Sequence, residues 1–239
     1  MIQNSYGTDT IMNWSKFIVF MKLDDPYVWP ALVGKVKERL QSFNCDQLLV
    51  ICVNIAHSLS SEATGFFSLC SAHFSGKLDQ DYNPSSVDTL LKEEDLPKLL
   101  TTFGEYRMLD RILAEGIADY VKDNMMFIKL ENLSDICVLY SKYCDKTQID
   151  AFQQQNLERI LSNVPFCTDE VYFRFLWTFC RDRRLPENDR RTFVKTFEDN
   201  HVQFNNKYFV QSMVLLAKDN TKKQNMTLYN TVGKRYDVK

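Results

Sequence analysis

The feature that most constrains the fold of this chain is an apolar pattern that recurs at a nearly fixed interval. Apolar sets at i, i+3, i+4 and i+7 begin at Leu96, Leu133, Tyr172 and Phe209, at intervals of 37, 39 and 37 residues. This spacing places each set on one face of a helix. An interval in this range is typical of helical hairpins that are too small to bury an apolar face alone and therefore stack. The sets are Leu96, Leu99, Leu100 and Phe103; Leu133, Ile136, Cys137 and Tyr140; Tyr172, Phe175, Leu176 and Phe179; and Phe209, Ser212, Met213 and Leu216.

The pattern predicts an all-α fold, an α-α superhelix or solenoid of about five helical hairpins with a period of about 37–39 residues. Only 7 Gly and 6 Pro occur, which favours long helices joined by short loops. The helix over 110–124 is expected to bury Ile112, Leu113, Ile117 and Val121. Helices are predicted over residues 27–43, 46–59, 66–78, 94–109, 110–124, 131–144, 149–163, 171–184, 190–200 and 206–218.

Three parts are predicted: an N-terminal extension over 1–25, a helical-repeat domain over 26–219, and a polar C-terminal tail over 220–239. The interval from Leu48 to Leu96 is 48 residues, and the surplus lies in an inserted loop over 79–93. Insertions in helical arrays enter loops on one face. The loop is therefore either a contact loop or a neutral insertion.

The extension carries Trp14, Phe17 and Phe20, which are bulky for a solvated tail. The amphipathic segment 16–23 either docks on the first hairpin as a strand or helical turn, or acts as an arm that inserts into a neighbouring subunit. The three aromatic residues are the candidate partner-binding residues.

The formal net charge of −2 does not indicate a nucleic-acid-binding chain. Residues 181–239 nevertheless carry 13 Lys and Arg against 7 Asp and Glu, so this part is the one suited to an anionic partner. Seven scattered Cys without a C-x-x-C pair predict an intracellular, reducing compartment with no disulfide framework and no structural zinc. No stretch approaches the ~20 apolar residues of a transmembrane helix.

No catalytic motif is present, and the paired carboxylates all lie where a helix is predicted to begin, which capping explains. Cys70 and His73 form an i, i+3 pair, but two ligands are too few for a metal. A buried histidine with a satisfied ring is the better interpretation. We predict that the chain is not an enzyme and has no catalytic residues, no metal, no cofactor and no small-molecule substrate.

Five arginines lie at the junction of the last two predicted hairpins. Arginine suits phosphate, and aromatic residues upstream offer stacking surfaces, so the segment is a candidate site for single-stranded RNA. Interleaved Asp182, Glu187 and Asp189 favour the alternative of a solvated, salt-bridged turn. The candidate RNA-binding residues are Arg181, Arg183, Arg184, Arg190, Arg191 and Trp177.

Through the apolar sets quoted above, over about residues 28–219, the chain resembles organellar helical-repeat proteins of the octotricopeptide and heptatricopeptide kind. It also resembles the repeat region of FAST-kinase-like proteins. The resemblance implies RNA binding in an organelle, or a structural place in an organellar ribonucleoprotein. It is also the basis for expecting a mitochondrial location.

These observations predict a non-catalytic scaffold subunit that binds other protein subunits of a large assembly, such as a mitochondrial ribosome or a respiratory or ATP-synthase complex. The alternative is an RNA-binding helical-repeat protein that acts in organellar RNA processing or translation.

Overall fold

The computed structural model describes residues 7–23, 25–58, 62–78, 90–180, 187–200 and 203–219. Within these residues all regular structure is helical, which confirms the all-α prediction. The chain divides into two compact units, Met1–Asn124 and Met125–Lys239. The predicted repeat domain spans both units, and each unit is described by itself below.

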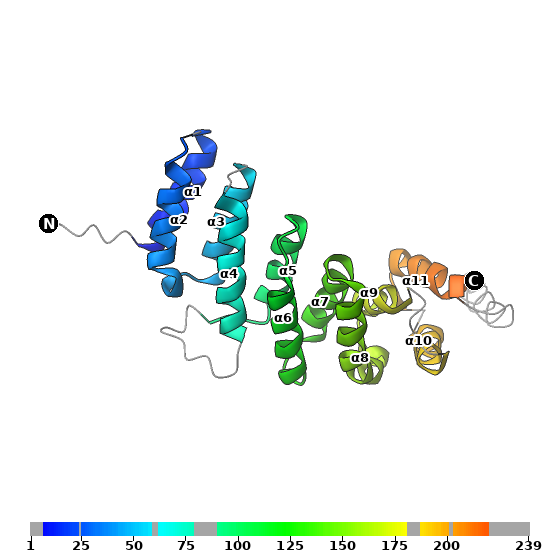
Figure 1. Cartoon of the computed structure of the whole chain (residues 1–239). Coiled ribbons are helices and arrows are strands. Elements are labelled where there is room, and N and C mark those ends of the chain that lie inside the picture. The colour runs from blue at the N-terminus through cyan, green and yellow to red at the C-terminus, as the bar shows by residue number, and fades with distance from the viewer. Residues whose placement is uncertain are drawn as a thin grey trace. The chain divides into compact units, whose positions relative to one another are not determined.

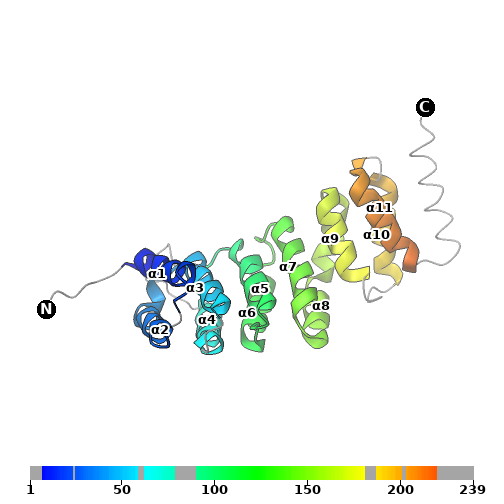
Figure 2. The same ribbon diagram turned by 90° about the horizontal axis from the view of Figure 1, so that it is seen from above.

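The first unit contains six α-helices in its described residues. Helix α3 packs against α1, α4 and α5, while α4 also packs against α2 and α6. Figures 1 and 2 both show α3 and α4 between the pair α1 and α2 and the pair α5 and α6. The helices are α1 (Thr8–Phe20), α2 (Val28–Glu38), α3 (Cys45–His57), α4 (Glu62–Leu78), α5 (Asp95–Glu105) and α6 (Arg111–Asp123), with a short 3₁₀ turn η1 (Leu40–Ser42) after α2.

The described residues of the second unit form five α-helices. Helix α9 packs between α7 and α11, and α8 packs against both α7 and α10 (Figure 2). The helices are α7 (Leu130–Tyr143), α8 (Lys146–Asn163), α9 (Asp169–Cys180), α10 (Glu187–Asn200) and α11 (Asn206–Asp219), with a 3₁₀ turn η3 (Val164–Phe166) between α8 and α9.

Polar side chains fix where several helices begin. Asn44 accepts a hydrogen bond from the Gln47 amide at 2.9 Å, and the Gln47 side chain accepts one from the Asn44 amide at 3.1 Å. Asp145 and Gln148 form the same reciprocal pair at the start of α8. Asp110 accepts from the amide of Leu113 at the start of α6. These bonds satisfy amide donors that have no partner inside the helix.

The recurring apolar sets lie on the inner faces of α5, α7, α9 and α11. Every member is buried except Met213, which is half-buried. The prediction that Ile112 faces inward is wrong, because its side chain is 62 % exposed. Since Asp110 caps α6, the buried stripe of that helix begins one residue later, at Leu113. The stripe comprises Leu113, Ala114, Ile117, Ala118 and Val121.

Hydrogen bonds between neighbouring helices repeatedly join residues separated by nearly the same number of positions. In the first unit, Asn54 Nδ2 donates to Ser15 Oγ at 2.9 Å, across 39 positions. Ser71 Oγ donates to Asp110 Oδ1 at 2.6 Å, again across 39 positions. In the second unit, the Asn205 amide donates to Asp169 across 36 positions, and Asn200 Nδ2 donates to the Pro165 carbonyl across 35. Arg174 pairs with Asp135, 39 positions away, at 2.6 Å.

Several predicted boundaries differ from the structure. Residues 8–20 of the predicted extension form α1, which packs on α2 and α3. The helix predicted over 27–43 ends at Glu38, since Arg39 leaves the helical conformation (φ −133°, ψ 21°). Residues 79–89 of the predicted loop and the tail 220–239 lie outside the described residues.

Candidate functional site: an apolar groove between α1 and α2

An apolar groove of about 770 Å³ runs between α1 and α2. Helix α1 supplies one wall with Trp14 and Phe17, and α2 supplies the other with Val28 and Leu32. Lys35 is the only charged side chain among the described residues that line it. The lining residues are Thr10, Ile11, Asn13, Trp14, Phe17, Ile18, Leu23, Val28, Ala31, Leu32 and Lys35.

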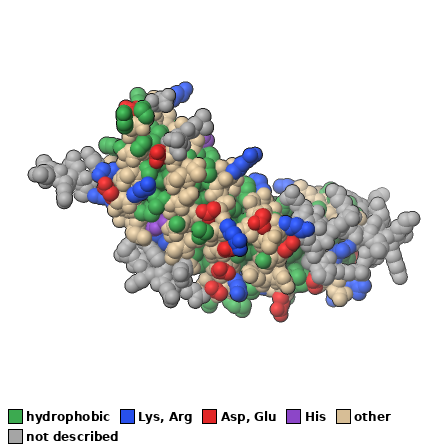
Figure 3. Space-filling view, viewed as in Figure 1, with side chains coloured by type: hydrophobic (Ala, Val, Ile, Leu, Met, Phe, Trp, Pro, Cys, Tyr) green, Lys and Arg blue, Asp and Glu red, His purple; other side chains and the backbone are tan. Residues whose placement is uncertain are grey.

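Large apolar side chains surround the groove and are exposed to solvent. Trp14 is 53 % exposed, Phe17 is 56 % and Phe20 is 82 %. Leu23 and Tyr27, in the connection between the two helices, are also exposed. Figure 3 shows hydrophobic side chains at the surface over α1 and α2. Exposed apolar side chains gathered around one groove make it a candidate interaction surface.

Polar contacts hold α1 firmly on α3. Gln47 Nε2 donates to Thr8 Oγ1 at 3.1 Å and to Asp9 Oδ1 at 2.8 Å, at the start of α1. Two turns further along both helices, the buried Ser15 hydroxyl accepts from Asn54 and donates to the Met12 carbonyl. Ile11 and Ile18 are buried on the same side of the helix as Ser15. The adjacent side of α1, which carries Trp14 and Phe17, is therefore presented on a fixed support.

Sequence reasoning selected Trp14, Phe17 and Phe20, and the structure places all three on α1. It brings Trp14 and Phe17 together in the groove, whereas Phe20 lies beyond the groove lining. The α2 wall was missed. Its lining residues repeat at i, i+3, i+4 and i+7 (Val28, Ala31, Leu32 and Lys35), a signal that could have identified the second wall.

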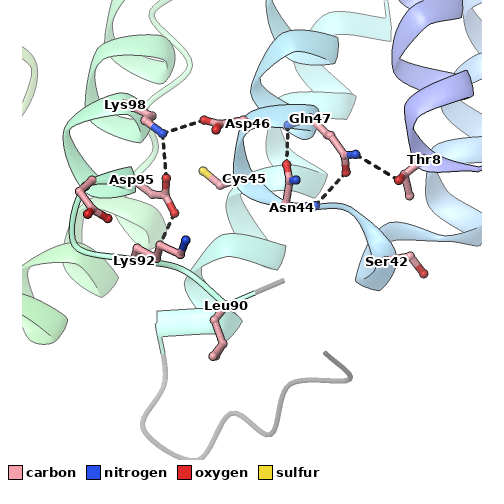
Figure 4. A pocket seen from close by; sticks show the side chains of 11 residues that line it. Thr8, Ser42, Asn44, Cys45, Asp46, Gln47, Leu90, Lys92, Asp95 and Lys98 are labelled. Carbon is pink, nitrogen blue, oxygen red and sulfur yellow. Dashed lines mark hydrogen bonds and ion pairs between the residues drawn. The ribbon is translucent and has the colours of Figure 1, made fainter. Parts of the chain in front are cut away.

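A second, polar cavity of about 510 Å³ lies near the start of α3 and α5 (Figure 4). Lys98 Nζ lies 2.8 Å from Asp46 Oδ1 and 3.1 Å from Asp95 Oδ1. The hydrogen bond that the Lys98 ammonium donates to Asp46 raises the pKa of Lys98 above its ordinary value. Burial raises the pKa of the adjacent Cys45 thiol and keeps it protonated. The charged groups here mainly satisfy one another, and a protonated thiol is a weak nucleophile.

The candidate RNA-binding residues lie only partly within the described chain. Arg181, Arg183 and Arg184 fall outside the described residues. Arg190 is half-buried and Arg191 is exposed on α10, while Trp177 is half-buried on α9. Each of these three residues already interacts with another group. The arginine cluster as a phosphate-binding site therefore stays a prediction.

Cys70 and His73 are both buried on α4. Burial, with a smaller contribution from the Lys77 ammonium, lowers the pKa of His73 to about 4. Its Nε2 atom is buried and has no hydrogen-bond partner among the described residues, which differs from the satisfied ring expected from the sequence. Within the described ranges, no three His, Cys, Asp or Glu side chains come close enough to hold a metal ion.

The sequence matches no protein-family model and no curated protein. Among the described residues, no helix combines the length and the apolar character needed to cross a bilayer. The fold and the site thus define an all-helical chain with an exposed apolar groove at α1 and α2.

Proposed function

We propose that the chain is a non-catalytic helical-repeat scaffold that binds another protein through the α1–α2 groove. The observation that carries the proposal is the exposure of Trp14 and Phe17 in a groove whose α1 wall is fixed by Gln47 and Asn54. Aromatic anchors on a preorganised support lose little side-chain entropy on binding, so they contribute strongly to protein interfaces.

The repeat architecture is part of this proposal. In both units, contacts join every second helix: α1 to α3 and α3 to α5, and α7 to α9 and α9 to α11. Stacked hairpins produce this pattern, because the first helices of successive hairpins pack together and so do the second helices. The hydrogen bonds across 35–39 positions support the same view, since they join residues that occupy equivalent places in successive hairpins.

A place in a large assembly is the further part of the proposal, and the same surface supports it, because exposed apolar grooves often mark protein–protein contacts. The organellar setting, in a mitochondrial ribosome or a respiratory or ATP-synthase complex, rests on the family resemblance alone. RNA binding through the arginine cluster is the competing function, and the same experiment separates the two.

The test is the native size of the chain in cell extract, before and after nuclease treatment. A scaffold held by protein contacts runs far above the 28.1 kDa of the single chain and stays there after nuclease. The double variant Trp14→Ala/Phe17→Ala then loses the large species. The matched control is Phe127→Ala/Phe166→Ala, which removes two aromatic side chains that are 84 % and 83 % exposed outside the groove.

Two results contradict the proposal. A large species that collapses after nuclease treatment means that RNA holds it, and Arg190 and Arg191 become the residues to substitute. A large species that survives in the groove variant as it does in the control means that the partner binds elsewhere. Far-UV circular dichroism of each variant confirms that the helices remain folded.

A further inference from the structure

We infer that the α1–α2 groove binds one short amphipathic α-helix of a partner protein, with a carboxylate at the end of that helix that meets Lys35. The inference rests on the proposed function and adds the chemistry of the partner.

The positions that line the groove carry the argument for a helix. On α2, the lining residues stand at i, i+3, i+4 and i+7, from Val28 to Lys35. On α1, Thr10, Trp14 and Phe17 stand at i, i+4 and i+7. Two helices that present such rows form a groove that accepts the side-chain ridge of a third helix. Recognition of an amphipathic helix in an apolar groove uses these spacings.

The length of the groove limits the partner segment. From Thr10 to Phe17 the rise is about 10 Å, at 1.5 Å per residue, and the same span applies to α2. A ridge of this length needs about two helical turns and three apolar side chains at i, i+3 or i+4, and i+7. The groove volume of about 770 Å³ gives room for the side chains of such a ridge and not for the whole helix.

The concave shape argues against a second copy of the chain as the occupant. A two-fold interface brings the same patch of both copies together. If two copies met through this patch, their two grooves would face each other and both would stay unfilled. A partner helix, in contrast, fills the groove with its ridge of side chains. Helix α1 of a second copy cannot supply such a ridge either. Its Ile11 and Ile18 are already buried within their own chain, so the helix is not free to rotate.

The positive charge of Lys35 determines which charge the partner helix should carry at one of its ends. Because α1 and α2 are consecutive helices in contact, they form a hairpin, and Thr10 and Lys35 both lie at the end away from its turn. Lys35 pairs with Glu38 at 2.9 Å, but both side chains are 59 % exposed, so the pair is weak. No other charged side chain among the described lining residues competes with Lys35 at this end. A partner carboxylate at this end is therefore favoured.

The experiment measures the binding of three synthetic peptides to the full chain by fluorescence anisotropy. The first peptide has Leu, Phe and Leu at i, i+4 and i+7 on a Glu- and Ala-rich helix. The second has Lys in place of each Glu, and the third has the first composition in alternating apolar–polar order. We expect the first peptide to bind roughly tenfold more tightly than the third, and a few-fold more tightly than the second, with the preference over the second weakening as salt rises.

Two variants locate the binding. Phe17→Ala weakens the first peptide roughly tenfold, whereas Phe166→Ala, which removes an equally aromatic exposed side chain, leaves it unchanged. Lys35→Glu reverses the preference between the Glu and Lys peptides, which a purely apolar contact cannot do. Equal affinity for all three peptides, or a preference that Lys35→Glu does not change, overturns the inference.

Its failure is distinguishable from failure of the proposed function. When the peptides do not bind but the large species in extract still requires Trp14 and Phe17, the partner is not a helix and the scaffold function stands. When light scattering shows that the chain alone dimerises through Phe17, the occupant is a second copy and the inference is wrong.

Discussion

His73 gives the chain a defined sensitivity to acid. Its side chain is only 8 % exposed on α4, and its Nε2 atom has no hydrogen-bond partner among the described residues. Burial, together with Lys77, lowers its pKa from the ordinary 6.5 to about 4. The folded state therefore holds the neutral ring, while the unfolded chain binds a proton as soon as the pH falls below about 6.5.

The magnitude follows from the two pKa values. Above about pH 6.5 neither state is protonated and His73 makes no contribution to pH dependence. As the pH falls toward 4 the unfolded state binds more protons, so stability decreases by about 2 kcal/mol at about pH 5 and by about 3 kcal/mol when both states are protonated. This is a large fraction of the stability of a typical domain.

The assay is urea unfolding of the full chain, followed by circular dichroism between about pH 7.5 and about pH 5, for the native protein and for His73→Gln. Because glutamine does not titrate, the difference between the two free energies of unfolding changes by about 2 kcal/mol over this range, whatever the constant effect of the substitution. Parallel curves would refute the reasoning. The chain has three His, so an NMR titration of the imidazole signals gives the pKa of His73 directly.

Three further predictions concern stability and reactivity. Arg174→Ala removes the partly buried ion pair with Asp135, and we expect the free energy of unfolding to fall by about 1 kcal/mol. A double-mutant cycle with Asp135→Ala assigns this loss to the pair, and additive effects would show that the two residues are not coupled. Asp110→Ala removes the cap of α6 and the acceptor of the Ser71 hydroxyl, so it lowers the free energy of unfolding by about 1–2 kcal/mol. The matched control is Ser71→Ala, which removes only the second of these hydrogen bonds and should cost less. Burial raises the pKa of Cys144 to about 12, so iodoacetamide should alkylate it much more slowly than glutathione at about pH 8, and equal rates would contradict this.

The helices could be predicted from the sequence because apolar periodicity is a local property. The sets that begin at Leu96, Leu133 and Tyr172 are buried as expected. Helix α1 was not predicted as a helix, since residues 13–15 were taken to precede a short amphipathic segment over 16–23 that forms a strand or a helical turn, or an arm. Ser15 instead lies inside α1, where a hydrogen bond from Asn54 satisfies it in the core. That partner is 39 positions away, so a local pattern does not reveal it.

The groove was predictable only in part. The bulk of Trp14 and Phe17 marked them as residues that a solvated tail does not need. The opposite wall depends on how α1 lies against α2, and this packing is decided by the contacts of both helices with α3 and α4. Burial of His73 was expected, but the absence of a hydrogen-bond partner for its Nε2 atom among the described residues was not. Burial of Lys77 was not predicted either, because burial of a charged group depends on neighbours from other helices.

The pairing of α3 with α5 has a consequence for engineering the chain. Lys98 reaches Asp46 across 52 positions and Tyr106 reaches His57 across 49, whereas equivalent helices elsewhere are linked across 35–39. The contact between α3 and α5 thus tolerates about ten extra residues in the chain that connects α4 to α5. The free-energy cost of closing a loop, which is entropic, grows only by about 0.6 kcal/mol for each doubling of the loop length. This connection is therefore the natural place to insert a fluorescent or affinity module. Such a fusion would report on the chain in cells while the α1–α2 groove keeps its native sequence.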